Sequence, residues 1–185
     1  MSLARGGGRG VRITIGALAA ALLAALTSVA RAQQSAADSA YRLFQEGERA
    51  AQAGTAEEVR RGIATLANAA AIFARAGEPS GEAAMWVHIG SAYLRLGRAD
   101  STITYARRAL AQYARLTDPR GEAEALDRIA QAHQAMGQRD SALRTFLAEV
   151  SKRRQAADTA GEARALYDVA DSSFQGGRAD SAIPY

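Results

Sequence analysis

The sequence predicts an all-α fold, an α-solenoid of about three and a half stacked antiparallel helix pairs. Two motifs recur at an interval of forty residues and stay in phase over three copies, and such a period is typical of repeat architectures. No strand-like alternation of apolar and polar residues follows the N-terminal segment. The first motif is Gly-Glu-Ala at Gly81, Gly121 and Gly161, and the second begins at Gly97, Gly137 and Gly177.

Residues 1–32 have the composition of a secretory signal peptide. Three arginines without an acidic residue precede an uncharged, mostly apolar run over residues 13–26, and Ala30-Arg31-Ala32 supplies the small residues that a signal peptidase requires. We expect cleavage after Ala32 and a secreted or periplasmic mature protein that begins with a flexible lead over residues 33–39. The apolar run is shorter than the ~20 residues of a spanning helix, so an uncleaved anchor is the weaker alternative.

Charge and cysteine content exclude several classes of function once this segment is set aside. Four of the 23 basic residues lie within residues 1–32, which hold no acid, so residues 33–185 carry 19 basic and 19 acidic residues. A neutral domain gives no reason to expect a nucleic acid or an anionic membrane as partner. The chain has no cysteine, so disulfides and a lipid anchor on cysteine are excluded and packing alone must stabilise it.

The helical domain is expected to begin near residue 40 and to continue to Tyr185. In its second unit an apolar stripe through Met85, Ile89 and Ala92 predicts a first helix, and Gly97 after it suits a left-handed C-terminal cap. The later units repeat this arrangement. Their expected bounds are about 40–77, 81–118, 121–158 and, for the incomplete last unit, 161–185.

Acidic residues and prolines indicate where the helices begin. Glu78-Pro79 and Asp118-Pro119 predict an acidic N-cap followed by proline in the first turn, where its missing N–H costs nothing. Asp158 occupies the same place in the next unit. Asp100 is expected to cap the second helix of its own unit.

These units resemble tetratricopeptide repeats. Four positions of that family's first helix (bulky, leucine-like, small and tyrosine) are filled by Trp86, Ile89, Gly90 and Tyr93. Later units match less fully, because His133 and Ser173 replace the tyrosine. The period exceeds the family's ~34 residues and resembles the longer repeats found ahead of caspase-like CHAT peptidase domains and in some bacterial sensor proteins. The resemblance implies that the first helices line a concave face on which partners dock.

No pattern in the sequence predicts catalysis, a cofactor or a metal site. His133 occupies the tyrosine position and is expected to pack there with a polar tip. His88 has alanines one turn away on both sides, so it lacks a metal-ligand partner on its own helix face. The basic run 152–154 is expected to form a solvated turn at a helix C-terminus. We therefore expect a chain that is not an enzyme.

The expected binding site is the concave face of the solenoid. Its candidate partner-binding residues are Val87, Ser91, Leu94, Arg95, Asp127, Gln131, Gln134, Tyr167, Asp171 and Phe174. This mixture of polar and apolar side chains suits a protein or peptide ligand, and an ordinary solvated face is the alternative. A C-terminal carboxylate is not expected as ligand, because the Lys/Asn clamp that binds it in some family members is missing.

The function expected from the sequence is that of an exported scaffold for protein–protein interaction. The alternative is the N-terminal regulatory region of a larger enzyme, such as a CHAT-type peptidase or a sensor kinase. Tyr185 falls inside the expected second helix of the last unit, and repeat arrays need a polar capping element after their last unit. The same open end predicts self-association through apolar residues such as Ile183.

Overall fold

Helices joined by short turns make up the described chain. The computed structural model describes residues 8–52 and 54–175, and every regular element in these ranges is an α-helix. The predicted all-α fold is therefore confirmed. The helices are α1 (Gly8–Ala51), α2 (Ala56–Ala76), α3 (Pro79–Arg95), α4 (Ala99–Leu116), α5 (Pro119–Ala135), α6 (Arg139–Gln155) and α7 (Thr159–Gln175).

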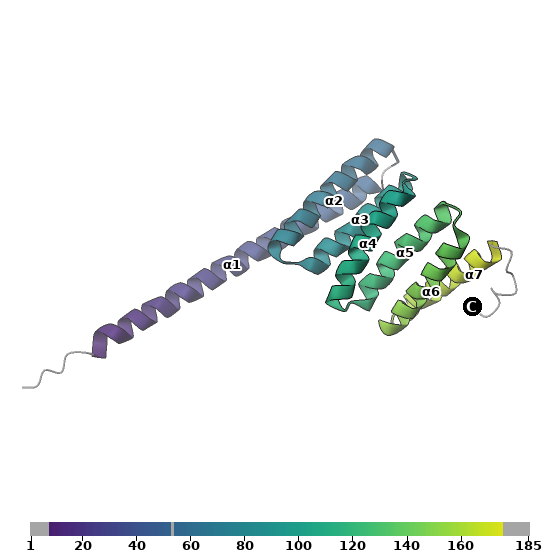
Figure 1. Cartoon of the computed structure of the whole chain (residues 1–185). Helices are drawn as coiled ribbons and strands as arrows, with labels where there is room; N and C mark the ends of the chain where they lie inside the picture. The colour runs from purple at the N-terminus through teal and green to yellow at the C-terminus, as the bar shows by residue number, and fades with distance from the viewer. Residues whose placement is uncertain (1–7, 53, 176–185) are drawn as a thin grey trace, which may run out of the picture.

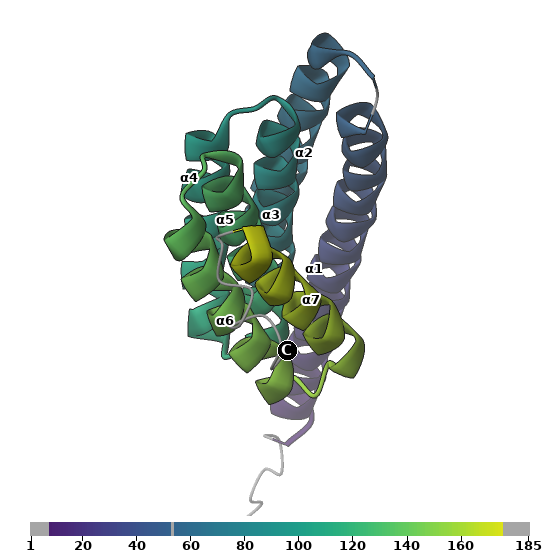
Figure 2. The same cartoon turned by 90° about the vertical axis from the view of Figure 1, so that its right-hand side faces the viewer.

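The helices stack in chain order, as Figure 1 shows. Each one packs mainly against its neighbours in the sequence, and α3 also contacts α1 and α5. Figure 2 shows the same stack from the side of α7. Contacts between alternate helices are expected when successive helix pairs are laid on one another, so the solenoid prediction is confirmed.

The first helix is longer than the sequence predicts. It runs unbroken through residues 33–39, so the expected flexible lead is helical in the structure. No glycine or proline interrupts residues 17–46, which are rich in the good helix formers alanine and leucine. Leu18, Leu22 and Leu26 remain exposed, and Figure 1 shows this half of α1 standing clear of the other helices. No helix in the described ranges combines the length and apolarity needed to cross a bilayer.

Two of the predicted acidic caps form in the structure. The Oδ1 atoms of Asp118 and Asp158 accept hydrogen bonds from the N–H groups of Gly121 (3.0 Å) and Gly161 (2.9 Å). Each bond satisfies a backbone donor that the first turn of a helix leaves unpaired. These contacts fix the points at which α5 and α7 begin.

The other two predicted caps were wrong. Glu78 precedes α3, but its side chain makes no capping hydrogen bond. Its carboxylate sits one methylene further from the backbone than an aspartate's, which suits the cap geometry less well. Asp100 lies within the first turn of α4, because the cap position falls on Arg98, whose side chain makes no such bond.

Left-handed backbone ends helices at positions forty residues apart. Gly97 (φ 70°) and Gly137 (φ 71°) adopt it, which confirms the cap predicted for Gly97. The same conformation ends the second helix of each unit, at Gly77 (φ 74°), Thr117 (φ 54°) and Ala157 (φ 52°). Thr117 and Ala157 thus adopt a backbone conformation that favours glycine. Gly177, and with it the expected incomplete helix and open end at residues 176–185, lies outside the described residues.

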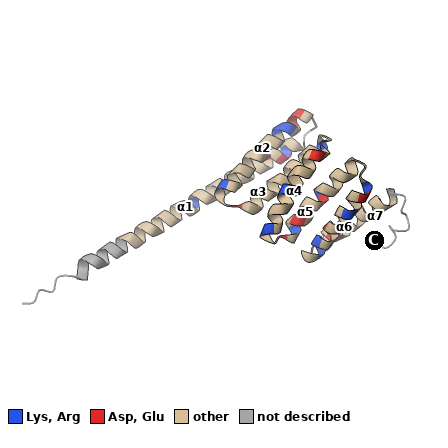
Figure 3. Ribbon diagram, in the orientation of Figure 1, with Lys and Arg blue, Asp and Glu red and all other residues tan. Residues whose placement is uncertain are grey.

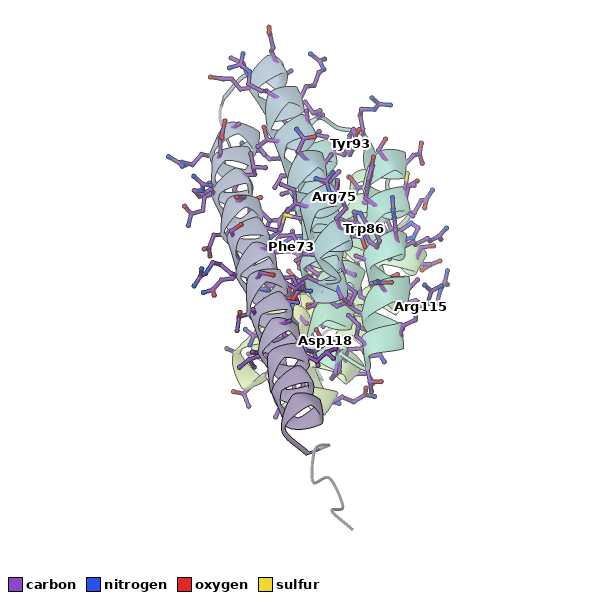
Figure 4. All side chains as sticks on the ribbon, turned by 90° about the vertical axis from the view of Figure 1, so that its left-hand side faces the viewer. Phe73, Arg75, Trp86, Tyr93, Arg115 and Asp118 are labelled. Carbon is purple, nitrogen blue, oxygen red and sulfur yellow. The ribbon has the colours of Figure 1, made fainter. Side chains whose placement is uncertain are left out.

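Buried hydrophobic side chains form two clusters in the described residues. The first spans α1 to α5 and includes Phe73, Trp86 and Tyr113, while the second joins α5, α6 and α7 around Phe146. Figure 4 shows Phe73 and Trp86 among the packed helices and Arg115 pointing away from them. Trp86 fills the bulky position identified in the sequence, and the guanidinium of Arg108 lies 3.9 Å from its ring centroid.

Charged side chains are also buried, at the point where α5, α6 and α7 meet. Asp127, Glu149 and Arg153 are only 1%, 0% and 5% exposed. The positions forty residues earlier belong to the first hydrophobic cluster and hold Val87, Ala109 and Tyr113. One interface between helix pairs is therefore apolar, and the next interface in the chain is ionic at the equivalent positions.

The glycine of the Gly-Glu-Ala motif lets successive helix pairs approach closely. A Cβ atom on Gly81 would lie 2.5 Å from Cδ1 of Phe73, which is far inside contact distance. The same relation recurs one unit at a time, between Phe73 and Gly81, Tyr113 and Gly121, and Arg153 and Gly161. The recurring glycine thus faces a bulky side chain near the end of the preceding helix, which is the physical reason for the motif.

We expect Gly121→Ala to destabilise the fold by about 1–3 kcal/mol, because the added methyl group would collide with the buried ring of Tyr113. The matched control is Gly90→Ala, whose Cβ would lie 3.4 Å from the nearest atom, the carbonyl oxygen of Thr102. That change should stabilise α3 by roughly 0.5–1 kcal/mol through helix propensity. Urea denaturation measures both, and equal effects of the two substitutions would contradict this account of the motif.

Candidate functional site

A pocket of about 550 Å³ lies where the first helices of three successive pairs come together. Side chains from α3, α5 and α7 line it, together with the turn between α6 and α7. We call it the concave pocket and define it by Val87 and Ser91 of α3, Arg120, Asp127 and Arg128 of α5, and Arg164 of α7.

Three residues predicted from the sequence line this pocket. Val87 and Asp127 are buried at 5% and 1% exposure, so they form its floor and offer a ligand little surface, while Ser91 is half-buried. Gln131 lies one turn beyond Asp127 on α5 and donates a hydrogen bond to its Oδ1 atom at 2.7 Å. Gln131 therefore orients the buried carboxylate.

The other predicted groove residues are distributed along the same three helices. Tyr167 and Phe174 on α7 are 71% and 69% exposed. The half-buried ones are Leu94, Gln134 and Asp171. Arg95 is engaged elsewhere, because its Nη2 atom donates to the backbone oxygen of Gln52 at 3.2 Å. Of this set, the two aromatic side chains are the ones placed to contact a partner directly.

Sequence reasoning missed the arginines of the pocket. Arg120, Arg128 and Arg164 line it, and none was among the predicted residues. The sequence did contain a signal. Glu124 and Arg164 are forty residues apart, as Asp127 and Tyr167 of the predicted set are, and each lies one helical turn before its counterpart in that set. Because neighbouring rows of one helix face lie side by side, the predicted groove was displaced by one turn.

Buried carboxylates hold two of these arginines, Arg128 and Arg164, in place. Asp127 Oδ2 lies 3.4 Å from Nη2 of Arg164 and 3.5 Å from Nη2 of Arg128. Behind it, Glu149 Oε1 lies 3.1 Å from Nη2 of Arg153 and 3.8 Å from Nη2 of Arg164. The network therefore connects α5, α6 and α7.

The turn between α6 and α7 belongs to the same network. Arg153 Nη1 donates to Asp158 Oδ2 at 2.8 Å, so Arg153 connects Glu149 to the residue that caps α7. The hydrogen bond from the Gly161 N–H and then the bond from Arg153 lower the pKa of Asp158. The capping carboxylate is thus held in its charged form.

Glu149 is the electrostatic exception in this network. Burial and, after it, the neighbouring charge of Asp127 raise the pKa of Glu149 to about 7, against the opposing effect of Arg153. Its Oε2 atom is buried and has no hydrogen-bond partner in the described part of the chain. Burial and the same Asp127 charge also raise the pKa of Asp168 on α7.

His88 connects the edge of the pocket to α1. Its Nδ1 atom lies 2.8 Å from Oε1 of Glu48, and its ring centroid lies 4.7 Å from that of Phe44. The hydrogen bond with His88 is the main cause that lowers the pKa of Glu48. His133 is half-buried, and its Nδ1 atom lies 2.7 Å from Gln138 Oε1. Among the described residues no His, Cys, Asp or Glu cluster is arranged to hold a metal ion.

These helix pairs are similar to those of known proteins. The model of the tetratricopeptide repeat family matches residues 81–148, which contain α3, α4, α5 and most of α6. Residues 81–148 therefore contain tetratricopeptide repeats. The resemblance carried by Trp86, Ile89, Gly90 and Tyr93 is therefore confirmed, whereas the link to the longer repeats ahead of CHAT peptidase domains remains a prediction.

Solved structures share the fold of this chain. The repeat domain of FLU from Arabidopsis is 20% identical with a TM-score of 0.54, over 57% of this chain and 89% of that one. Aspartyl phosphate phosphatase F from Bacillus subtilis is 14% identical with a TM-score of 0.74, over 88% of this chain and 44% of that one. The present chain thus spans less than half of the phosphatase, and the likeness concerns the fold alone. No curated protein matches the sequence.

The raised pKa of Glu149 makes the stability of the interface between the α5–α6 pair and α7 depend on pH, with a sign that follows from the two pKa values. Because the folded-state pKa of about 7 exceeds the ordinary value of 4.5, the folded chain binds more protons between these values. This stabilising contribution is complete below the ordinary pKa and is lost as the pH rises through about 7. We expect Glu149→Gln, which keeps the side chain neutral, to reduce the fall in unfolding free energy between about pH 5 and pH 8 by roughly 1–3 kcal/mol.

Urea denaturation over that pH range measures the effect. The control is Glu124→Gln, which removes a carboxylate whose side chain is 45% exposed and should leave the slope of stability against pH unchanged. A Glu149→Gln variant with the slope of the unmodified protein would contradict the placement of this carboxyl group.

Proposed function

We propose that the chain is a non-enzymatic scaffold whose concave face docks a protein or peptide partner. The observation that supports this most directly is that one pocket draws side chains from three successive first helices, with two exposed aromatic residues further along α7, Tyr167 and Phe174. Stacked repeats characteristically use such extended concave surfaces for binding. Exposed aromatic side chains are frequent anchors at protein interfaces, because they bury a large area at a small entropic cost.

Site-specific photo-crosslinking tests the proposed face. We expect p-benzoylphenylalanine at Ser91 or Tyr167 to form adducts with a protein partner in the cells that express the chain. The same probe at Arg107 of α4 or Arg144 of α6, both exposed on second helices, should form none. Adducts at all four positions, or at the two control positions alone, would place the interaction on another face.

We also propose that residues 1–32 direct export and are removed, so that the mature protein functions in a secreted or periplasmic location. Support comes from the difference in burial between the two halves of α1. Its side chains join the buried core at Ala40, whereas the apolar side chains between Leu18 and Val29 are exposed. Residues 18–30 contain no charged side chain, and Figure 3 shows this described stretch of α1 in tan. Removal of residues 1–32 would therefore leave the buried contacts of the repeats in place.

We expect mass spectrometry of the exported fraction to find a chain that begins at Gln33. Ala32→Arg should block processing, because a signal peptidase requires a small residue immediately before the cut. The control Gln34→Arg adds the same charge outside the small-residue positions and should be processed normally. An intact N-terminus on cytosolic protein would contradict the proposal.

A further inference from the structure

The charges of the concave pocket are arranged in two layers. The carboxylates lie beneath, with the side chain of Asp127 2% exposed and that of Glu149 0% exposed. The arginines lie above them, with side-chain exposures of 72% for Arg120, 56% for Arg164 and 30% for Arg128. Although residues 33–185 carry equal numbers of acidic and basic residues, the side chains that reach the surface of this pocket are mainly arginines.

The buried acids are already engaged by the protein. Asp127 interacts with Gln131, Arg128 and Arg164, and Glu149 interacts with Arg153 and Arg164. They are too deeply buried to be reached by a cationic ligand without disrupting these contacts. Among the pocket's carboxylates Glu124 is well exposed, and its contact with Arg120 is long, at 4.0 Å.

The arginines, in contrast, retain unused donors. Arg164 contacts Asp127 and Glu149 through its Nη2 atom, and its Nη1 and Nε groups form no hydrogen bond within the described part of the chain. Arg128 uses Nη1 for Gln131 and Nη2 for Asp127, and its Nε atom is buried, so Arg128 contributes mainly its positive charge at the pocket. Both guanidinium groups are thus oriented by the carboxylates beneath them, and Arg164 keeps donors available to a ligand.

We propose that the concave pocket binds an acidic peptide segment, whose Asp or Glu side chains pair with Arg164, Arg128 and Arg120. This inference rests on the proposed docking function and specifies the chemistry of the partner. A planar guanidinium fork matches a carboxylate in bidentate geometry. The underlying acids hold Arg164 and Arg128 in position before the ligand arrives, which reduces the entropy lost on binding.

The surroundings of the pocket favour a peptide over a polyphosphate. Glu124 at the pocket and Asp168 further along α7 would repel a ligand with closely spaced negative charges. A peptide can space its carboxylates to meet the arginines and place apolar side chains against Tyr167. Nucleic acid binding, by comparison, requires a basic surface along several consecutive phosphates.

Fluorescence anisotropy with labelled octapeptides tests the proposal. The probes are alternating Glu-Ala, Lys-Ala and Gln-Ala peptides, and we expect the Glu-Ala peptide alone to bind, more weakly as salt is raised. Arg164→Gln should weaken its binding by about tenfold or more, since a charge-assisted contact is lost. Arg120→Gln should weaken it as well, and because that side chain is 72% exposed the variant does not depend on the buried network for folding.

The control variant is Arg107→Gln on α4, which changes the net charge equally but lies outside the pocket and is exposed. It should bind the Glu-Ala peptide as the unmodified protein does. The inference is overturned if Arg107→Gln weakens binding as much as Arg164→Gln, if the Lys-Ala or Gln-Ala peptide binds equally well, or if an oligonucleotide displaces the acidic peptide preferentially.

Failure of this inference can be distinguished from failure of the docking proposal. Concave-face crosslinks to a protein, together with no binding of the Glu-Ala peptide, would overturn the acidic chemistry and leave the docking function standing. Absence of concave-face crosslinks would overturn the docking function itself.

Discussion

The close approach of each helix pair to the next is the constraint on which the other features depend. It requires a residue without a side chain opposite a bulky group near the end of the preceding helix, as Gly81 stands opposite Phe73 and Gly121 opposite Tyr113. Because this contact fixes where α3 and α5 lie relative to their predecessors, it also brings their faces into one surface. The pocket formed by α3, α5 and α7 follows from the same repeated contact.

Local sequence signals predicted the fold because each acts over one or two turns. Gly97 ends its helix in the left-handed conformation, and Asp118 caps the helix that follows it, as their residue types indicate. Glu78 shows the limit of such reasoning, since a carboxylate at the right position but on a longer side chain forms no cap. The continuation of α1 through residues 33–39 was missed because polar composition was taken for flexibility where no helix-breaking residue is present.

The site was predicted only in outline, for a physical reason. Hydrophobic periodicity shows which side of a helix faces the core, but the boundary between core and groove depends on how far successive pairs rotate. Asp127 therefore appeared to be a groove residue although it is 1% exposed, and Arg164, one turn away, was overlooked. Tyr167 and Phe174, which were predicted for the same face, are exposed. They lie off the apolar stripe of their helix, so they do not face the core.

The ionic layer around Glu149 and Arg153 has a consequence for cooperativity. Stability in a repeat array is approximately a sum of unit terms and neighbour terms, so the coupling between two units depends on what fills their interface. The first interfaces are filled by aromatic and aliphatic groups, and the next is filled by buried charges whose attraction is offset by their desolvation. The ionic layer lies between the α5–α6 pair and α7, whereas α5 and α6 are joined by the apolar cluster around Phe146, so we expect α7 to be the helix least tightly coupled to the rest. The acidic residues that orient Arg164 lie along this boundary, so local opening of α7 would also take the concave pocket apart.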